Sequence, residues 1–241
     1  MENNNDRPLK IIEKDNGEVA KKYYQTIYKD LGYVSYKSSM EIMIPVIVNG
    51  DQIINVKFGN TNDVLGSIVD VSELGKWTKL FEYYNCTLLN YSILPTTGGL
   101  NNIKRQLGND RIDTFIYALG RYYQNDTARI LNAGSEKMNI ENRALLKYVL
   151  DSFGSVYGFC RKIYGITNRS LINRMTETEP KAILEKKDLG EYLMLAVDIW
   201  EYRFKYMIQN NIISLNKDRQ EIVSYHFKNM REGIESDLIR T

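Results

Sequence analysis

The spacing of apolar residues changes along the chain, from short β-prone runs near the start to helical spacing later. Met43 to Val48 and Gln52 to Phe58 are two such runs, and the pair Asn49-Gly50 separates them. This pair tolerates the two positive φ angles of a type I′ turn, so the pattern predicts a β-hairpin over residues 43–58. Pro45 lacks a backbone N–H, which favours a sheet edge for the first strand.

Three further elements are expected in the first part of the chain. An apolar residue at every fourth position from Val19 to Leu31 predicts a helix, which begins near Glu18 and which Gly32 ends. Ser72 is typical of a helix N-cap, and the residues after it predict a helix over 73–84. The stretch from Thr87 to Leu94 has the composition of a strand.

From Leu100 onward the pattern predicts helices almost throughout, over residues 100–107, 110–123, 140–164, 167–175, 179–186, 188–209 and 217–239. Strands first and helices afterwards define an α+β fold. A small antiparallel sheet, made of the hairpin 43–58 and the strand 87–94, is expected to pack against a mainly helical C-terminal part. We expect a flexible arm over 1–17 and a single domain over 18–241, with a strand-containing part 18–99 and a helical part 100–241.

Apolar stripes on three of the predicted helices indicate where the core lies. Stripes of aromatic residues and methionine are core far more often than they are ligand sites. The last stripe is narrow and flanked by charges, so this helix either closes the domain or pairs with a second subunit in a homo-oligomer. The stripes are Leu145, Leu146, Val149, Leu150, Phe153, Val156, Tyr157, Cys160 and Ile163; then Leu189, Tyr192, Leu193, Ala196, Ile199, Trp200, Phe204 and Met207; and finally Val223, Phe227, Met230, Ile234 and Leu238.

The composition is that of a globular protein, with 43% hydrophobic and 26% charged residues among 241. A net charge of +2 means that any basic site must be local. No apolar run reaches the ~18 residues of a membrane-spanning helix, and no signal-peptide pattern begins the sequence, so we expect a soluble, cytoplasmic protein with no membrane contact. Abundant asparagine, lysine, isoleucine and tyrosine are typical of AT-rich coding DNA, which indicates a bacterial or phage source.

The few cysteine and histidine residues exclude several kinds of catalytic site. Cys86 and Cys160 are far apart and have only His226 to complete a zinc set, so we interpret both as buried free thiols rather than as a disulfide or metal ligands. His226 lies at the border of the last apolar stripe and is interpreted as a partly buried structural residue. Hydrolysis that depends on histidine is therefore disfavoured.

Most of the candidate chemistry lies between Ile93 and Tyr123. After the strand, the loop Thr96-Thr97-Gly98-Gly99 precedes a helix that begins near Leu100 or Asn101. Unpaired amides at that helix start, together with threonine hydroxyls, predict a site for a phosphate or carboxylate, which Lys104 and Arg105 can reach. The patterns GxxxxGK[ST] and GxGxxG are both absent here, and a simple glycine turn without a ligand is the commoner explanation of such a loop.

The helix that follows has two interpretations. Asp110 as N-cap and Asp113 in the first turn would satisfy exposed amides, but the same pair could hold a metal or act as acid and base. Arg111 and Arg121 face away from the apolar stripe and are either solvated or ion-paired. With Tyr122 and Lys104 they could also form a basic and aromatic face for a nucleotide or single-stranded nucleic acid.

This segment resembles a family of uncharacterised bacterial proteins over about 35 residues. Its members carry T-I-N-x-x-R-G ahead of a helix that begins D-R-F-D-x-T-L and ends R-x-x-Y. The counterparts are Thr97, Asn101 or Asn102, Arg105, Asp110, Arg111, Asp113, Arg121, and Tyr122 or Tyr123. The chain departs from the pattern at Gly98-Gly99, at Gln106 in place of glycine, and at Phe115 in place of leucine. The resemblance implies no activity.

These features lead us to expect a non-catalytic binding protein, without cofactor or metal, that recognises a phosphate-bearing ligand (a nucleotide or nucleic acid) or an acidic protein surface, in the setting of bacterium–phage conflict. One alternative is a metal-dependent enzyme acting on nucleotides or nucleic acid, with Asp110 and Asp113 at the metal. Another is a structural or assembly protein that dimerises through its last helix. The expected ligand-binding residues are Thr96, Thr97, Gly98, Gly99, Asn101, Asn102, Lys104, Arg105, Arg111, Arg121 and Tyr122.

Overall fold

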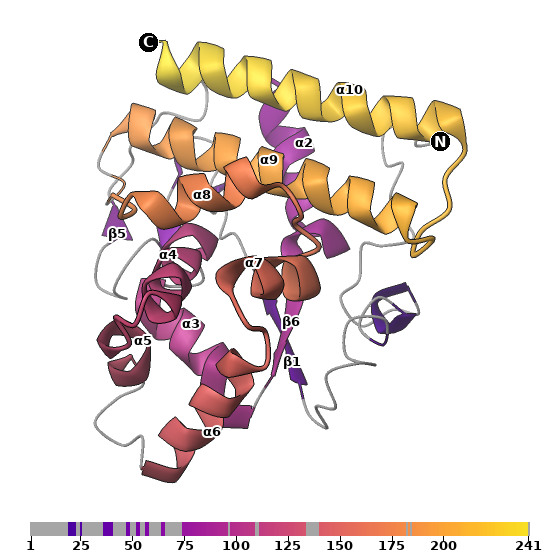
Figure 1. The fold of residues 1–241 in the computed structure, drawn as a ribbon. Coiled ribbons are helices and arrows are strands. Elements are labelled where there is room, and N and C mark those ends of the chain that lie inside the picture. The colour runs from indigo at the N-terminus through magenta and orange to yellow at the C-terminus, as the bar shows by residue number, and fades with distance from the viewer. Residues whose placement is uncertain are drawn as a thin grey trace.

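The computed structural model describes residues 19–22, 25, 36–40, 47–48, 52–53, 56–57, 64–65, 74–95, 97–108, 111–133, 140–181, 183 and 185–240. Within these residues helices predominate and strands are short, which confirms the α+β class (Figure 1). The expected arm over 1–17, the turn at Asn49-Gly50 and the expected N-cap Ser72 lie outside the described residues.

The described strands form three antiparallel pairs. Strand β2, Ile47–Val48, pairs with β3, Gln52–Ile53, as the predicted hairpin requires. Strand β6, Tyr91–Pro95, pairs with β1, Tyr36–Met40, which the sequence did not predict. The remaining pair joins β4, Val56–Lys57, to β5, Val64–Leu65. Within the described strands, the hairpin and β6 therefore belong to separate two-stranded sheets, and Figure 1 shows β6 beside β1.

The centre of the helical part is α9, Lys186–Gln209. Every residue of its predicted apolar stripe is buried. Helix α10, Lys217–Ile234, continues into a π-helical turn, Glu235–Ile239, and both pack against α9 (Figure 1). Helix α2, Trp77–Asn85, packs on α10. The α10 stripe from Val223 to Leu238 is buried too, so the last helix closes the core and this face is not available to a second subunit.

The other helices complete the core below α9 in Figure 1. Helix α4 packs against α3, α5 and α8, and α6 packs against the turn that precedes α3. Their apolar residues join those of α9 and α10 in one continuous cluster. The bounds are α3 Leu100–Gly108, α4 Ile112–Tyr123, α5 Ala128–Asn132, α6 Ile140–Asp151, α7 Val156–Phe159 with a π-helical turn Cys160–Tyr164, and α8 Arg169–Glu177.

The predicted helix over 140–164 is two helices, because the chain turns at Gly154. This glycine has φ +72°, a value that other residues adopt with strain. Ser155 then caps α7, and its Oγ accepts a hydrogen bond of 3.0 Å from the Gly158 amide. Two residues of the predicted stripe, Leu145 on α6 and Tyr157 on α7, are 40% and 36% exposed instead of buried.

Three further predictions were wrong in detail. The described residues between 179 and 185 are not helical, since Pro180 disfavours helical geometry in the residue before it. Helix α2 begins at Trp77 with Lys76 as N-cap, and α4 begins after Arg111, so neither Ser72 nor Asp110 has the predicted capping position. Both cysteines are free thiols, but Cys86 is exposed and only Cys160 is buried as predicted. Burial raises the pKa of the Cys160 thiol.

The C-terminal turn is tied to the start of α2 by one carboxylate. Asp237 accepts hydrogen bonds of 2.8 Å from the Gly75 amide and 2.7 Å from Trp77 Nε1. Burial acts to raise the pKa of Asp237, but these hydrogen bonds outweigh it and lower the pKa below its ordinary value of 3.8. The ionised form is therefore the one that the fold stabilises.

We expect Asp237→Asn to lower the free energy of unfolding at neutral pH by about 1 kcal/mol. The reason is that the hydrogen bonds from the Gly75 amide and from Trp77 Nε1 would then go to a neutral amide instead of a charged carboxylate. The pKa is lower in the folded state, so the contribution is complete above pH 3.8 and is lost as the pH falls through the folded value. Urea unfolding of the unaltered protein and of Asp237→Asn at neutral and acidic pH measures this contribution. A stability difference between the two proteins that stays the same in acid would contradict the prediction.

Candidate functional site

The Gly98-Gly99 loop packs against α6 instead of opening into a pocket. Gly98 is buried with φ +70°, and a Cβ placed on it would lie 2.5 Å from Leu146 Cα. Residues 97–99 form a 3₁₀ turn that leads directly into α3. The glycine is therefore explained by close approach of two backbones, the turn and α6.

The other expected site residues do not converge on this loop. Lys104 is fully buried in α3, whereas Asn102 on the same helix is exposed. Arg121 forms an exposed ion pair of 2.9 Å with Asp126. The Tyr122 hydroxyl donates to Asp151 over 2.8 Å, and burial together with that carboxylate raises the pKa of Tyr122.

Among the described members of the expected pocket over 96–122, Arg111 pairs with Asp113 and Arg121 pairs with Asp126, so these two arginines do not converge on the loop. Thr96 lies outside the described residues, as do the side chains of Thr97, Asn101 and Arg105.

Arg111 and Asp113 form a buried ion pair at the start of α4. Arg111 Nε and Nη2 donate to the two oxygens of Asp113 over 3.0 and 2.6 Å, and Nη1 donates to the Lys181 carbonyl over 2.9 Å. The guanidinium lies 5.0 Å from the centre of the Tyr192 ring. Burial acts to lower the pKa of Arg111, but Asp113 outweighs it and raises that pKa.

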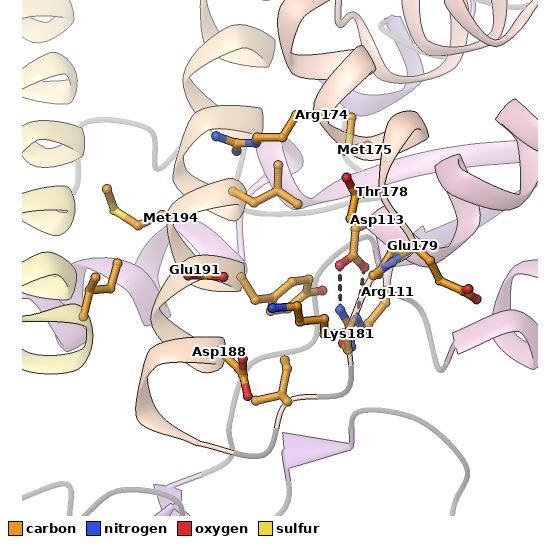
Figure 2. Close-up of a pocket in the computed structure, with 15 residues that line it drawn as sticks. Arg111, Asp113, Arg174, Met175, Thr178, Glu179, Lys181, Asp188, Glu191 and Met194 are labelled. Carbon is orange, nitrogen blue, oxygen red and sulfur yellow. Dashed lines mark hydrogen bonds and ion pairs between the residues drawn. The ribbon is translucent and has the colours of Figure 1, made fainter.

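This ion pair forms one wall of a pocket of about 420 Å³, the Arg111 pocket, shown in Figure 2. The pocket lies between the start of α4, the end of α8 and the first turns of α9. Its apolar surface comes from Met175, Ile183, Tyr192, Met194, Leu195 and Ile239. Arg111 holds the segment after α8 in place through the Lys181 carbonyl, so this side of the pocket is formed by contacts within the protein itself.

The alternative of a metal held by Asp110 and Asp113 finds no support in this geometry. Both oxygens of Asp113 accept from Arg111, and Oδ1 also accepts from the Thr114 amide over 2.8 Å. Asp110 lies outside the described residues. Across the part of the chain that the structure describes, no three histidine, cysteine, aspartate or glutamate side chains are grouped to hold a metal ion.

A second pocket, of about 540 Å³, lies between α7 and the first turn of α8 and is called the basic pocket here. It contains two arginines, Arg161 and Arg169, and no carboxylate among the residues that line it. Those residues are Phe153, Ser155, Tyr157, Gly158, Arg161, Ile166, Thr167, Arg169 and Ile172.

Two glycine turns shape the basic pocket. The Gly154 turn places Ser155 on its wall, and a side chain on Gly158 would collide with the carbonyl oxygen of Phe153. Gly165, at φ +66°, ends the π-helical turn that carries Arg161 and directs the chain toward Thr167. Both walls of the pocket thus depend on local backbone geometry that few residues other than glycine adopt.

Helix α8 is fixed at its start by Asn168. Its Oδ1 accepts from the Leu171 amide over 2.7 Å, and its Nδ2 donates to the Tyr202 hydroxyl over 2.6 Å. The cap holds the neighbouring Arg169 at the edge of the basic pocket.

The two arginines of the basic pocket are available to a ligand. Both are exposed, and neither forms an ion pair with a carboxylate of the described residues. The Arg169 guanidinium lies 5.4 Å from the centre of the Tyr157 ring, and the Tyr157 hydroxyl donates to Asn173 Oδ1. Sequence reasoning missed this site, because an arginine within a predicted helix is ordinarily a solvated side chain. The only signal was the pair Gly154 and Gly165 on either side of Arg161.

No helix within the described residues is both long and apolar enough to cross a membrane. No family model, curated protein or solved structure matches the chain. Fold and site together define a mainly helical α+β protein with a basic pocket and a pocket of mixed charge.

Proposed function

We propose that the protein is a cytoplasmic, non-catalytic binding protein whose basic pocket recognises a phosphate-bearing ligand, a nucleotide or a short stretch of nucleic acid. The observation that carries this proposal is the presence of Arg161 and Arg169 in one pocket that no carboxylate lines. A guanidinium presents a planar set of donors that fits two phosphate oxygens at once, and two of them supply charge as well as orientation.

The surroundings of the arginines favour a nucleotide over a bare anion. Tyr157 is 36% exposed and lines the pocket, so the part of its ring that the Arg169 guanidinium does not cover offers a surface on which a base can stack. The hydroxyls of Ser155 and Thr167 line the same pocket and can serve ribose or phosphate oxygens. A volume of about 540 Å³ is within the range of small-molecule sites.

A role in bacterium–phage conflict is the setting that we propose for such a protein, for example the capture of a nucleotide signal. It is based on the bias toward asparagine, lysine, isoleucine and tyrosine in the sequence. An acidic protein surface is the other partner that two unpaired arginines could attract, and the test below separates the two.

Calorimetric titration with mononucleotides, cyclic oligonucleotides, short single strands and inorganic phosphate tests the proposal. We expect at least one nucleotide compound to bind, and Arg161→Ala or Arg169→Ala to weaken it about tenfold, because each removes a charge-assisted contact. Binding should also weaken as salt is added.

Arg143→Ala is the matched control, since Arg143 is exposed on α6 and does not line the pocket. It should bind as the unaltered chain does. Full affinity in a chain that carries both arginine substitutions would place the ligand elsewhere. Absence of heat with every phosphate compound would remove phosphate recognition and leave the acidic protein surface as the partner.

A further inference from the structure

The Arg111 pocket has a different chemistry from the basic pocket, because charged groups of both signs line it together with apolar side chains. The charge of a ligand that fits this pocket depends on which of these groups lack a partner within the protein. The charged lining residues are Arg111, Asp113, Arg174, Glu179, Lys181, Asp188 and Glu191.

Most of these charges are already engaged. Arg111 pairs with Asp113 inside the pocket. Arg174 and Glu179 form ion pairs with residues that do not line the pocket. Asp188 has an interaction of its own and also acts on Arg111, whose pKa it helps to raise. These groups are balanced by the protein itself, so they do not select the charge of a ligand.

Two lining charges of opposite sign remain, those of Lys181 and Glu191. Both side chains are exposed, and neither forms an ion pair with any residue that the structure describes. Lys181 lies in the segment after α8, and Glu191 lies in the first turns of α9. Figure 2 shows the Lys181 side chain extending toward the part of α9 that carries Glu191. Two walls of the pocket therefore offer one cation and one anion to the same ligand.

The backbone positions of these two charges are fixed. The Lys181 carbonyl accepts a hydrogen bond of 2.9 Å from Arg111 Nη1, and Glu191 lies between two buried residues of a long helix. The pocket volume of about 420 Å³ is within the range of small-molecule sites. The apolar surface of the same pocket includes Met175, Ile183, Met194 and Leu195.

From this arrangement we infer that the Arg111 pocket binds a small zwitterion with an apolar side chain, as a free apolar amino acid presents. Its ammonium lies against Glu191, its carboxylate lies against Lys181, and its side chain contacts Met175 and Met194. A ligand with a single charge satisfies one of the two groups and is repelled by the other. Methionine sulfur makes favourable contacts with aromatic rings, so an aromatic side chain fits this surface. The site is independent of the phosphate-binding proposal.

Three probes with the same phenyl ring separate the two charges. L-Phenylalanine carries both, phenethylamine lacks the carboxylate, and hydrocinnamate lacks the ammonium. The chain is labelled at its methionine methyl groups, and each probe is titrated at low salt while the methyl resonances are followed by NMR. We expect L-phenylalanine to shift the resonances of Met175 and Met194, which line the pocket, and to leave those of Met207 and Met230, which are buried elsewhere. It should bind about threefold more tightly than either singly charged probe.

Two variants assign each charge to its side chain. Lys181→Gln should remove the advantage of L-phenylalanine over phenethylamine, because the carboxylate loses its counter-charge. Glu191→Gln should remove its advantage over hydrocinnamate, because the ammonium loses its own. Each change should weaken L-phenylalanine about threefold. The Lys181 change leaves the backbone carbonyl that Arg111 holds, and a purely structural role for these side chains would alter all three probes alike.

The matched controls are Lys79→Gln and Glu82→Gln, at exposed positions of α2 that do not line the pocket. Both should leave the affinity for each probe unchanged. Absence of a shift at Met175 and Met194 with L-phenylalanine would overturn the site itself. Equal affinity for the three probes, or the same preference in the Lys181→Gln and Glu191→Gln proteins as in the unaltered chain, would overturn the recognition of a zwitterion.

Discussion

Asp113→Asn should lower the free energy of unfolding by about 3 kcal/mol, because it leaves the buried Arg111 guanidinium without its counter-charge. The side chains of Arg111 and Asp113 are only 8% and 11% exposed, so water replaces the lost carboxylate only in part. The segment after α8 should loosen as well, since Arg111 also holds the Lys181 carbonyl. Urea unfolding followed by circular dichroism measures the change.

The pair Arg121 and Asp126 is the matched control, because it has the same chemistry at 43% and 46% exposure. Asp126→Asn should leave the free energy of unfolding almost unchanged, because solvent screens this exposed pair. Replacing both members of the buried pair, as Arg111→Met with Asp113→Leu, should cost less than the sum of the two single changes. Additive losses, or a loss at Asp126 as large as that at Asp113, would show that burial does not set the strength of the pair.

The sequence predicted the long helices well because the signals for them are local. The stripe from Leu189 to Met207 repeats over the whole of α9, and every residue of that stripe is buried, although Gly190, Leu195, Val197 and Arg203 are buried as well. The predicted end of α9 at residue 209 and the predicted start of α10 at residue 217 agree with the structure, in which Asn216 caps α10 by accepting from the Arg219 amide. In such segments the same helical period recurs at every turn, so the helix is predicted from nearby residues alone.

Elements that depend on distant partners were not predictable in this way. Strand β1, Tyr36–Met40, has no alternation of apolar and polar residues and exists through pairing with β6, more than fifty positions later. The break at Gly154 interrupts an apolar pattern that continues on both sides. A glycine inside a helical pattern is compatible with either outcome, and only packing decides whether it adopts φ +72°.

The candidate sites show the same contrast between local sequence signals and contacts with distant residues. The sequence singled out Arg111 and Asp113, which are two positions apart and form an ion pair, but the other hydrogen-bond partner of Arg111 is the carbonyl of Lys181, 70 positions away. The segment was therefore recognised, while its role as a frame for a pocket was not. Arg161 and Arg169 line one pocket because of the turn at Gly165, which no spacing rule for helices anticipates.

Gly98→Ala should lower the free energy of unfolding by about 4 kcal/mol, the other large effect that we expect. Part of this loss is strain, because φ at this residue is +70°. The larger part is steric, since the added methyl would lie 2.5 Å from Leu146 Cα and 2.6 Å from Leu146 N, and backbone atoms of α6 cannot turn aside as a side chain can.

Gly99→Ala separates the two causes. Gly99 has φ +72°, nearly the same as its neighbour, but a Cβ placed on it meets nothing within 4 Å. Only the strain remains, so we expect a loss of about 1 kcal/mol. Thermal and urea unfolding of the two variants side by side measure the difference. Equal losses would mean that the left-handed backbone alone requires glycine here. They would contradict the close contact between Gly98 and the backbone of α6.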